Sequence, residues 1–222
     1  VETVRRLLRT ADVLVENFRP RVMASWGFGY EEVARINPRI VYASVSGFGQ
    51  SGPYRDRPAY GALMESEGGL AGLIGYAPDH PYRSGTSLPD PILGAAAALA
   101  IAAGLGQGLG TGRGVHLDLA MMDTTLAFLG SAVLTWTALG TARERWGNLS
   151  WGGAPEGCYP CQGRDEWVAL SVRDEKDWRA LAAVIGEPGL GSDPAYATPT
   201  GRLARLREIE TRIERWSRGR TK

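Results

Sequence analysis

The chain of 222 residues is long enough to bury a substantial core, and its 25 lysines and arginines nearly balance its 24 aspartates and glutamates. This balance excludes a broad basic surface, so no nucleic-acid partner is expected. Two cysteines and two histidines argue against a closed zinc site, and no metal is expected. The longest apolar run, residues 91–105, is too short and too rich in alanine and glycine to span a bilayer, and no signal peptide is visible. We therefore expect a cytoplasmic protein with no membrane partner.

Strand-like and helix-like segments alternate through the first half of the chain, in the manner of βα units. The predicted strands are residues 12–16 and 40–45, the predicted helices are residues 2–9, 30–36 and 59–73, and a loop rich in glycine and proline covers residues 47–58. The alternation predicts an α/β fold, in which a Rossmann-like large domain with a mostly parallel sheet precedes part of a smaller α+β domain.

Asp90 stands immediately before an alanine-rich run that predicts a helix over residues 91–105. Asp is a favoured N-cap and Pro91 suits the first helical position, so the local sequence favours a capping role for Asp90. A helix N-terminus also keeps a carboxylate ionised, and only the ionised form attacks a carbonyl carbon. Both roles stay open at this point. The glycine-rich tract at residues 104–114 is predicted to stop the helix and form a loop.

Further along the chain, residues 115–120 alternate as a half-buried strand, and a helix over residues 124–139 is predicted to be capped by Asp123 and ended by Gly140. A change in composition places a domain boundary after residue 140. The predicted organisation is a large domain at 1–140, a linker at 141–157 and a small domain at 158–222. The small domain is predicted to hold strands around Cys158 and Trp167, a helix at 175–185 capped by Asp174, and a charged helix at 202–216.

Two short motifs suggest redox functions, and the residues that follow each motif argue against them. Residues 47–52 match the G-x-G-x-x-G fingerprint of nicotinamide and flavin enzymes, but residues 53–58 continue as a loop where that motif requires a helix. Cys158 and Cys161 are spaced like a redox dithiol, but a turn and a strand follow them instead of a helix. A nucleotide-dependent oxidoreductase is kept only as an alternative.

The segment after the first predicted strand carries groups suited to a ligand, at the strand edge where open α/β sheets bind ligands. Asn17 can hydrogen-bond an amide or adenine, Phe18 can stack on a flat ring, and Arg19 or Arg21 can meet a phosphate. A turn with a buried phenylalanine explains the same residues without any ligand.

Five motifs, taken together and in this order, resemble the class III CoA-transferase family, which includes formyl-CoA transferase, carnitine CoA-transferase and acyl-CoA racemases. The motifs are Asn17-Phe18-Arg19-Pro20, residues 36–42, residues 46–53, Pro89-Asp90 before the alanine helix, and Thr111-Gly112-Arg113-Gly114. The resemblance covers nearly all of residues 1–139 and extends more weakly over residues 157–216.

The resemblance implies that Asp90 is the catalytic aspartate, which forms a mixed anhydride with the acyl group of an acyl-CoA and then an aspartyl-CoA thioester. An acceptor carboxylic acid completes the exchange. No cofactor is bound permanently, because coenzyme A is part of the substrate. Asn17 and Phe18 would lie against coenzyme A, and Gly152 and Gly153 would form the glycine loop that covers the acyl group.

The resemblance also leaves alternatives open. Racemases of the family place a His-Asp pair where this chain has Tyr60 and Gly61, which favours a transferase and leaves Tyr60 to orient the acyl group or simply to pack. Ser25 stands where relatives often have a basic residue. We expect the chain to be a fragment that lacks both ends of a family member that forms an interlocked homodimer. A truncated, non-catalytic subunit is therefore another alternative.

Overall fold

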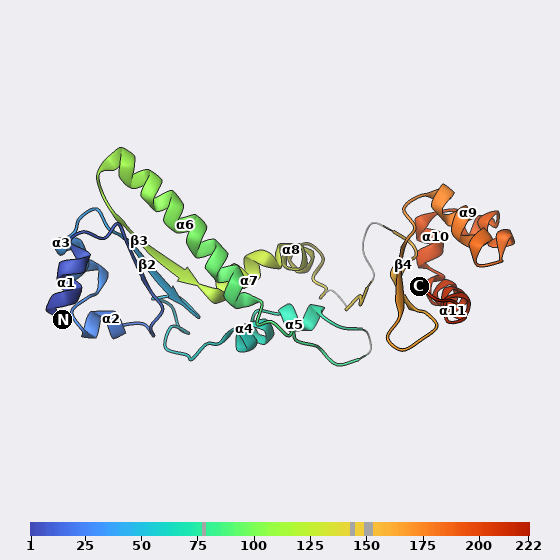
Figure 1. The fold of residues 1–222 in the computed structure, drawn as a ribbon, viewed down its shortest axis with the longest axis horizontal. Helices are drawn as coiled ribbons and strands as arrows, with labels where there is room; N and C mark the ends of the chain where they lie inside the picture. Colours follow the sequence, from blue (N-terminus) through green and yellow to red (C-terminus); the bar gives the residue numbers. More distant parts are fainter. Residues whose placement is uncertain (77–78, 143–144, 149–152) are drawn as a thin grey trace. The chain divides into compact units, whose positions relative to one another are not determined.

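The computed structural model describes residues 1–76, 79–142, 145–148 and 153–222, and it divides into two compact units, Val1–Arg145 and Trp146–Lys222 (Figure 1). The first unit holds a three-stranded parallel sheet among helices, and the second holds a two-stranded sheet among helices. The predicted α/β class with a parallel sheet is therefore confirmed.

The sheet of the first unit has the order β1-β2-β3, formed by β1 (Val13–Glu16), β2 (Val41–Ser46) and β3 (Val115–Ala120). Both strand pairs are parallel, with Val13 opposite Val41 and Val41 opposite Val115. The central strand β2 is buried over nearly its whole length, as expected for a parallel strand that is covered on both faces. All three strands lie within a residue or two of their predicted positions.

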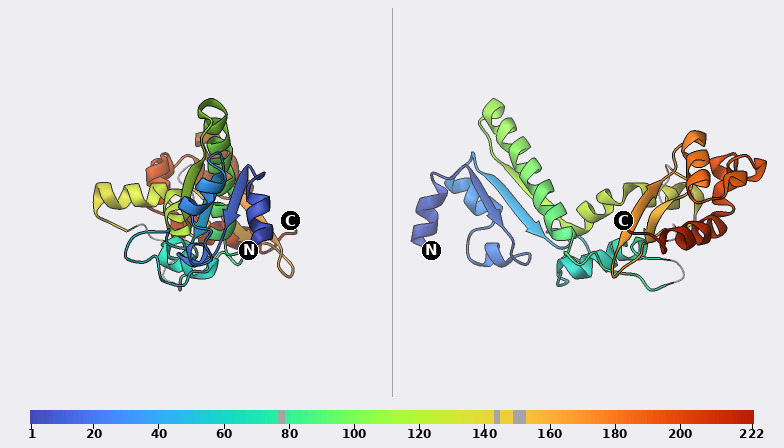
Figure 2. Two further views of the ribbon diagram at one scale, coloured as in Figure 1. Left: turned by 90° about the vertical axis from the view of Figure 1, so that its left-hand side faces the viewer. Right: turned by 45° about the vertical axis from the view of Figure 1, so that its right-hand side comes forward.

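Helices α1 (Glu2–Leu8) and α3 (Tyr30–Ile36) pack against one face of β2, while α6 (Pro89–Thr111) contacts β2 and β3 (Figures 1 and 2). A short helix, α2 (Val22–Ser25), precedes α3. The Tyr42 hydroxyl donates a hydrogen bond to the carbonyl of Phe28 at 2.9 Å inside this core. These layers fix the strands whose carboxyl ends carry the candidate site.

Helix α6 is longer than the sequence predicted, because it continues through the glycine tract to Thr111 and ends at Gly112, whose φ is 67°. The predicted loop over residues 104–114 is therefore wrong for most of its length. Each interior glycine weakens a helix by about 1 kcal/mol. Packing on the sheet outweighs this cost: a Cβ at Gly104 would lie 3.0 Å from Val115 and 3.2 Å from Val41, so glycine allows the helix to approach closely.

The greater length of α6 also corrects the membrane argument. By length and composition alone this 23-residue helix could cross a membrane, and its apolar window has a mean hydropathy of 1.8 with little of it buried. The sequence predicted that the apolar segment is too short to span a membrane. The length of α6 does not support that prediction. Its contacts with β2, β3, α4 and α7 are those of a helix that covers a sheet.

We expect Gly106→Ala to raise the free energy of unfolding by about 0.5–1 kcal/mol, because Gly106 is helical and a Cβ there meets nothing within 4 Å. Gly104→Val should lower it by about 1–3 kcal/mol through overpacking against the sheet. Urea unfolding of both variants measures the two shifts. A destabilising Gly106→Ala would contradict a helix through the tract.

The remaining helices of the first unit differ in detail from the prediction. The predicted helix at 59–73 consists of α4 (Gly61–Glu67) and α5 (Leu70–Leu73), separated at Gly69, whose φ is 84°. The predicted helix at 124–139 consists of α7 (Met121–Phe128) and α8 (Gly130–Leu139), and Gly140 ends α8 as predicted. The predicted capping role of Asp123 is wrong, because it lies in the first turn of α7 and Ala120 is the N-cap.

The second unit pairs β4 (Glu156–Pro160) with β5 (Trp167–Ser171) as antiparallel strands, in the predicted places. Asp174 caps α9 (Glu175–Val184) as predicted, accepting a hydrogen bond from the N–H of Asp177 at 2.8 Å. Cys158 lies within β4 and both cysteines are free, so no helix places them as a redox pair.

The predicted charged helix at 202–216 is two helices, α10 (Pro199–Leu203) and α11 (Leu206–Ser217). Arg202 is buried and donates hydrogen bonds to the carbonyls of Ala154 and Tyr196. Helix α10 ends at Leu203, directly after Arg202. Two short 3₁₀ helices, η1 (Pro188–Gly191) and η2 (Pro194–Tyr196), complete the unit. Its core contains Trp178, Ile209 and Ile213.

Candidate active site

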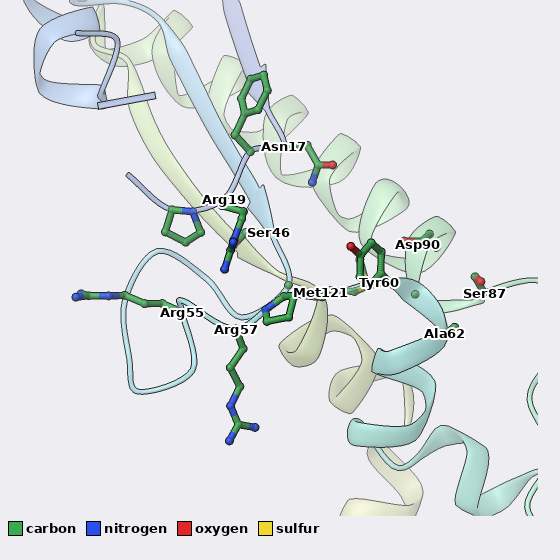
Figure 3. Close-up of a pocket in the computed structure, with 16 residues that line it drawn as sticks. Asn17, Arg19, Ser46, Arg55, Arg57, Tyr60, Ala62, Ser87, Asp90 and Met121 are labelled. Carbon is green, nitrogen blue, oxygen red and sulfur yellow. The ribbon is translucent and has the colours of Figure 1, made fainter. Parts of the chain in front are cut away.

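A cavity of about 620 Å³ lies in the first unit, at the carboxyl ends of the parallel strands (Figure 3). The residues that follow β1, the end of β2 and the residue after β3 all contribute to its wall. The lining residues are Asn17, Phe18, Arg19, Pro20, Ser46, Gly47, Arg55, Arg57, Pro58, Ala59, Tyr60, Gly61, Ala62, Ser87, Asp90 and Met121. This is the edge where open α/β sheets place ligands.

Asp90 enters this cavity from the first turn of α6 and does not cap the helix. The helix begins at Pro89, so Leu88 is the N-cap and Pro91 lies inside the first turn. The predicted capping role of Asp90 is therefore wrong. Its backbone N–H donates a hydrogen bond to the carbonyl of Ser87 at 3.0 Å. Among the described residues none pairs with its carboxylate, which is exposed and free to meet a ligand.

Gly61 lies directly against the Asp90 carboxylate. A Cβ at Gly61 would be 2.1 Å from Asp90 Oδ2 and 2.8 Å from the Cβ of Ser87, so no larger residue fits without movement. Gly61 opens α4, and the preceding Tyr60 is 72% exposed at the cavity wall. Figure 3 shows Tyr60 and Asp90 on the adjoining ends of α4 and α6. The first turns of two helices thus define the surroundings of the carboxylate.

The segment after β1 lines the cavity with Asn17, Phe18 and Arg19, as the sequence predicted, but their polar groups already have protein partners. Asn17 Nδ2 donates a hydrogen bond to the carbonyl of Val45 at 2.6 Å, and an Arg19 guanidinium nitrogen donates to the carbonyl of Asp56 at 2.8 Å. Arg21 does not line the cavity and pairs with the Asp56 carboxylate at 3.5 Å. These bonds attach the segment to β2 and to the loop before α4.

The sequence also predicted Gly152 and Gly153 as site residues. Gly152 falls outside the described residues. Gly153 belongs to the second unit, where a Cβ would lie 2.9 Å from the carbonyl oxygen of Val172. The role predicted for this glycine loop stays a prediction.

Sequence reasoning missed several residues of the wall, among them Ser46, Arg55, Arg57 and Ser87. The two arginines belong to the loop after β2, in residues 53–58, for which the sequence predicted a loop but no ligand contact. The signal was present, because loops that follow parallel strands reach the ligand-binding edge. Arg57 lies over the Tyr54 ring, 4.1 Å from its centroid.

The loop after β2 turns without starting a helix, as predicted, so the glycines of residues 47–52 do not present a helix N-terminus to a pyrophosphate. Instead the N–H of Gln50 donates to both oxygens of Asp118, at 3.0 and 3.1 Å. In the described part of the chain, no group of three or more acidic, histidine or cysteine side chains could hold a metal ion.

Glu65, on α4 behind the cavity wall, is a fully buried carboxylate. Burial opposes its ionisation, but hydrogen bonds from Ser84 and from the Leu88 N–H, together with the charge of Arg83, outweigh burial and lower its pKa. Sequence reasoning did not single it out. Glu65 lies four residues after Gly61, so the two residues share one face of α4, and Glu65 adjoins the buried Met64. This spacing was the available signal that Glu65 faces inward.

The family model of CoA-transferase family III matches residues 1–222. The chain belongs to this family. Among curated relatives, the acetyl-CoA:oxalate CoA-transferase of Acetobacter aceti is 40% identical over 210 residues, which are 94% of this chain and 54% of the relative. The succinyl-CoA–D-citramalate CoA-transferase of Chloroflexus aurantiacus is 34% identical over 96% of this chain and 53% of its own length.

Among solved structures, a CaiB/BaiF family protein from Brucella suis superposes on this chain with a TM-score of 0.89 at 29% identity. The match covers 98% of this chain and 57% of that protein. The chain thus spans about half the length of the relatives it matches.

Proposed function

We propose that the protein transfers coenzyme A from an acyl-CoA thioester to a carboxylic acid, with Asp90 as the nucleophile. The observation that carries the proposal is the exposed Asp90, whose carboxylate pairs with none of the described residues, in the wall of a cavity at the ligand-binding edge of the sheet. Membership in CoA-transferase family III, and relatives named as CoA-transferases for oxalate and citramalate, support the reaction class.

The first half of the reaction needs only the carboxylate and the thioester. An Asp90 oxygen attacks the thioester carbonyl, the new C–O bond forms as the C–S bond breaks, and the coenzyme A thiolate leaves. The thiolate then attacks the Asp90 carbonyl of the mixed anhydride. This releases the donor acid as its carboxylate and leaves an aspartyl-CoA thioester on the enzyme.

The second half reverses these steps with the acceptor. The acceptor carboxylate attacks the aspartyl carbonyl and expels the thiolate, and the thiolate attacks the acceptor carbonyl to give the new acyl-CoA and restore Asp90. No net proton transfer is required, which suits a cavity whose described lining contains neither histidine nor cysteine. Gly61 leaves the attacking oxygen uncovered.

Hydroxylamine trapping on the full protein tests this proposal. With an acyl-CoA donor, hydroxylamine is expected to convert the activated Asp90 into a hydroxamate, which peptide mapping by mass spectrometry locates. A panel of acceptors that includes oxalate, succinate and citramalate then measures transfer. Transfer without an adduct at Asp90 would contradict the mechanism. Exchange of the proton α to the thioester without any transfer would favour the racemase alternative.

A further inference from the structure

The buried carboxylate of Glu65 receives three hydrogen bonds, all of them from the turn that precedes Asp90. Glu65 Oε1 accepts from the Ser84 hydroxyl at 2.5 Å and from the Leu88 N–H at 3.0 Å, and Oε2 accepts from the Ser84 N–H at 2.9 Å. Arg83, in the same turn, lies 3.9 Å from Oε2. A single side chain on α4 thus binds both ends of the 84–88 turn.

This turn sets where α6 begins. Leu88 is the N-cap of α6, but its side chain cannot accept hydrogen bonds, so no capping bond is made by the N-cap residue itself. The N–H of this N-cap residue donates to Glu65, which ties the start of the helix to α4. The next link is Ser87, with a positive φ of 49°, whose carbonyl accepts from the Asp90 N–H at 3.0 Å. A continuous series of hydrogen bonds and backbone links therefore connects Glu65 to Asp90.

A purely stabilising role does not require a carboxylate at this position. A fully buried charge costs free energy unless every acceptor is satisfied, and an apolar side chain of similar volume often serves stability as well. The neighbouring residue Met64 is equally buried and apolar. The acceptors of Glu65, which lies on α4 with Gly61, are directed to the turn that immediately precedes α6, which carries Asp90.

We propose that Glu65 is a positioning residue, which fixes the 84–88 turn and so holds the Asp90 carboxylate against Gly61 in the orientation for attack. The proposal rests on the proposed function, because it concerns the same nucleophile. Glu65 acts as a hydrogen-bond acceptor, and Oε1 accepts from the Ser84 hydroxyl and the Leu88 N–H. Any side chain that places an oxygen at the position of Oε1 preserves these two hydrogen bonds.

The test compares Glu65→Leu with Glu65→Gln in steady-state transfer assays on the full protein. Glu65→Leu removes every acceptor and is expected to lower kcat by about 10²-fold, while the KM for acyl-CoA changes less than about threefold, because misorientation acts on the chemical step. Glu65→Gln retains one oxygen for Leu88 and Ser84, and is expected to recover kcat to within about tenfold of the wild type. The rate of hydroxamate formation at Asp90 should follow kcat.

Tyr42→Phe is the matched control, because it removes one buried hydrogen bond from the same unit at a core cluster that does not line the cavity. It should lower thermal stability without changing kcat. If Glu65→Leu does not fold, Ser84→Ala, at a partly exposed position, takes its place with an expected loss in kcat of about 3- to 10-fold.

A wild-type kcat in Glu65→Leu would overturn the proposal, as would a loss that Glu65→Gln shares in full or that Tyr42→Phe reproduces. In the fallback case, an unchanged kcat in Ser84→Ala would overturn it. Asp90→Asn, assayed in parallel, separates the two proposals. If Asp90→Asn transfers normally, the proposed function fails. If Asp90→Asn is inactive while Glu65→Leu is normal, only the positioning role fails.

Discussion

Asp90→Asn is expected to lower kcat for CoA transfer by at least about 10³-fold, because the amide is isosteric but is not a nucleophile toward a thioester. The cavity and the hydrogen bond from the Asp90 N–H to Ser87 involve backbone and neighbours that the substitution leaves in place. Binding of coenzyme A should therefore survive. Steady-state transfer rates and calorimetric titration with coenzyme A measure the two properties.

The matched control is Asp123→Asn, which removes another exposed carboxylate from the first turn of a helix, α7, outside the cavity. We expect its kcat to stay within about twofold of the wild type, as for surface substitutions away from a site. Equal losses in the two variants would mean that the helix N-terminal charge, and not the nucleophile, is responsible.

Gly61→Ala is expected to lower kcat by about 10²-fold, because the new methyl group would lie 2.1 Å from Asp90 Oδ2 and must displace the carboxylate. Alanine is a good helix former and Gly61 does not have a positive φ, so the backbone itself tolerates the change. Transfer kinetics together with thermal unfolding separate the local displacement from general destabilisation.

Gly72→Ala, in α5, adds the same methyl group where nothing lies within 4 Å, and it should leave kcat unchanged. An active Gly61→Ala variant would show that the carboxylate has room to move without loss of function. A strong loss in the Gly72→Ala variant would show that α5 is coupled to the reaction in a way its open surroundings do not explain.

The parallel sheet was predictable because two of its strands are short apolar runs bounded by turn residues and the third alternates apolar and polar residues, and both patterns are local in the sequence. The glycine tract was predicted wrongly for a physical reason. Its conformation depends on contact between Gly104 and two valines on strands far away in sequence, and propensity contains no information about that contact. The separation of α10 from α11 was missed as well, and the buried Arg202 of α10 bonds to the carbonyl of Ala154, 48 residues away, which a local pattern does not report.

For the candidate site, Asp90 could be selected from the sequence only through the family resemblance, since local signals favoured a cap. The capping prediction failed because helix α6 starts one residue before Asp90, and because Glu65, 23 residues before Leu88, accepts a hydrogen bond from the N–H of the actual N-cap residue. Such a partner is invisible to a rule that examines only neighbouring residues. The loop after β2 could be placed at the ligand-binding edge from the sequence, but which of its side chains face the cavity depends on the three-dimensional path of the loop.

The two ends of the parallel sheet have different freedom to change over evolution. At the carboxyl ends, loops and helix starts surround the cavity, so substitutions there change the cavity wall without rebuilding the layers beneath. At the amino end of β3, a side chain on Gly114 would lie 2.0 Å from the carbonyl oxygen of Ile40, so substitutions there disturb the fold itself. The cavity wall can therefore vary at one edge of the sheet while the opposite edge stays almost fixed.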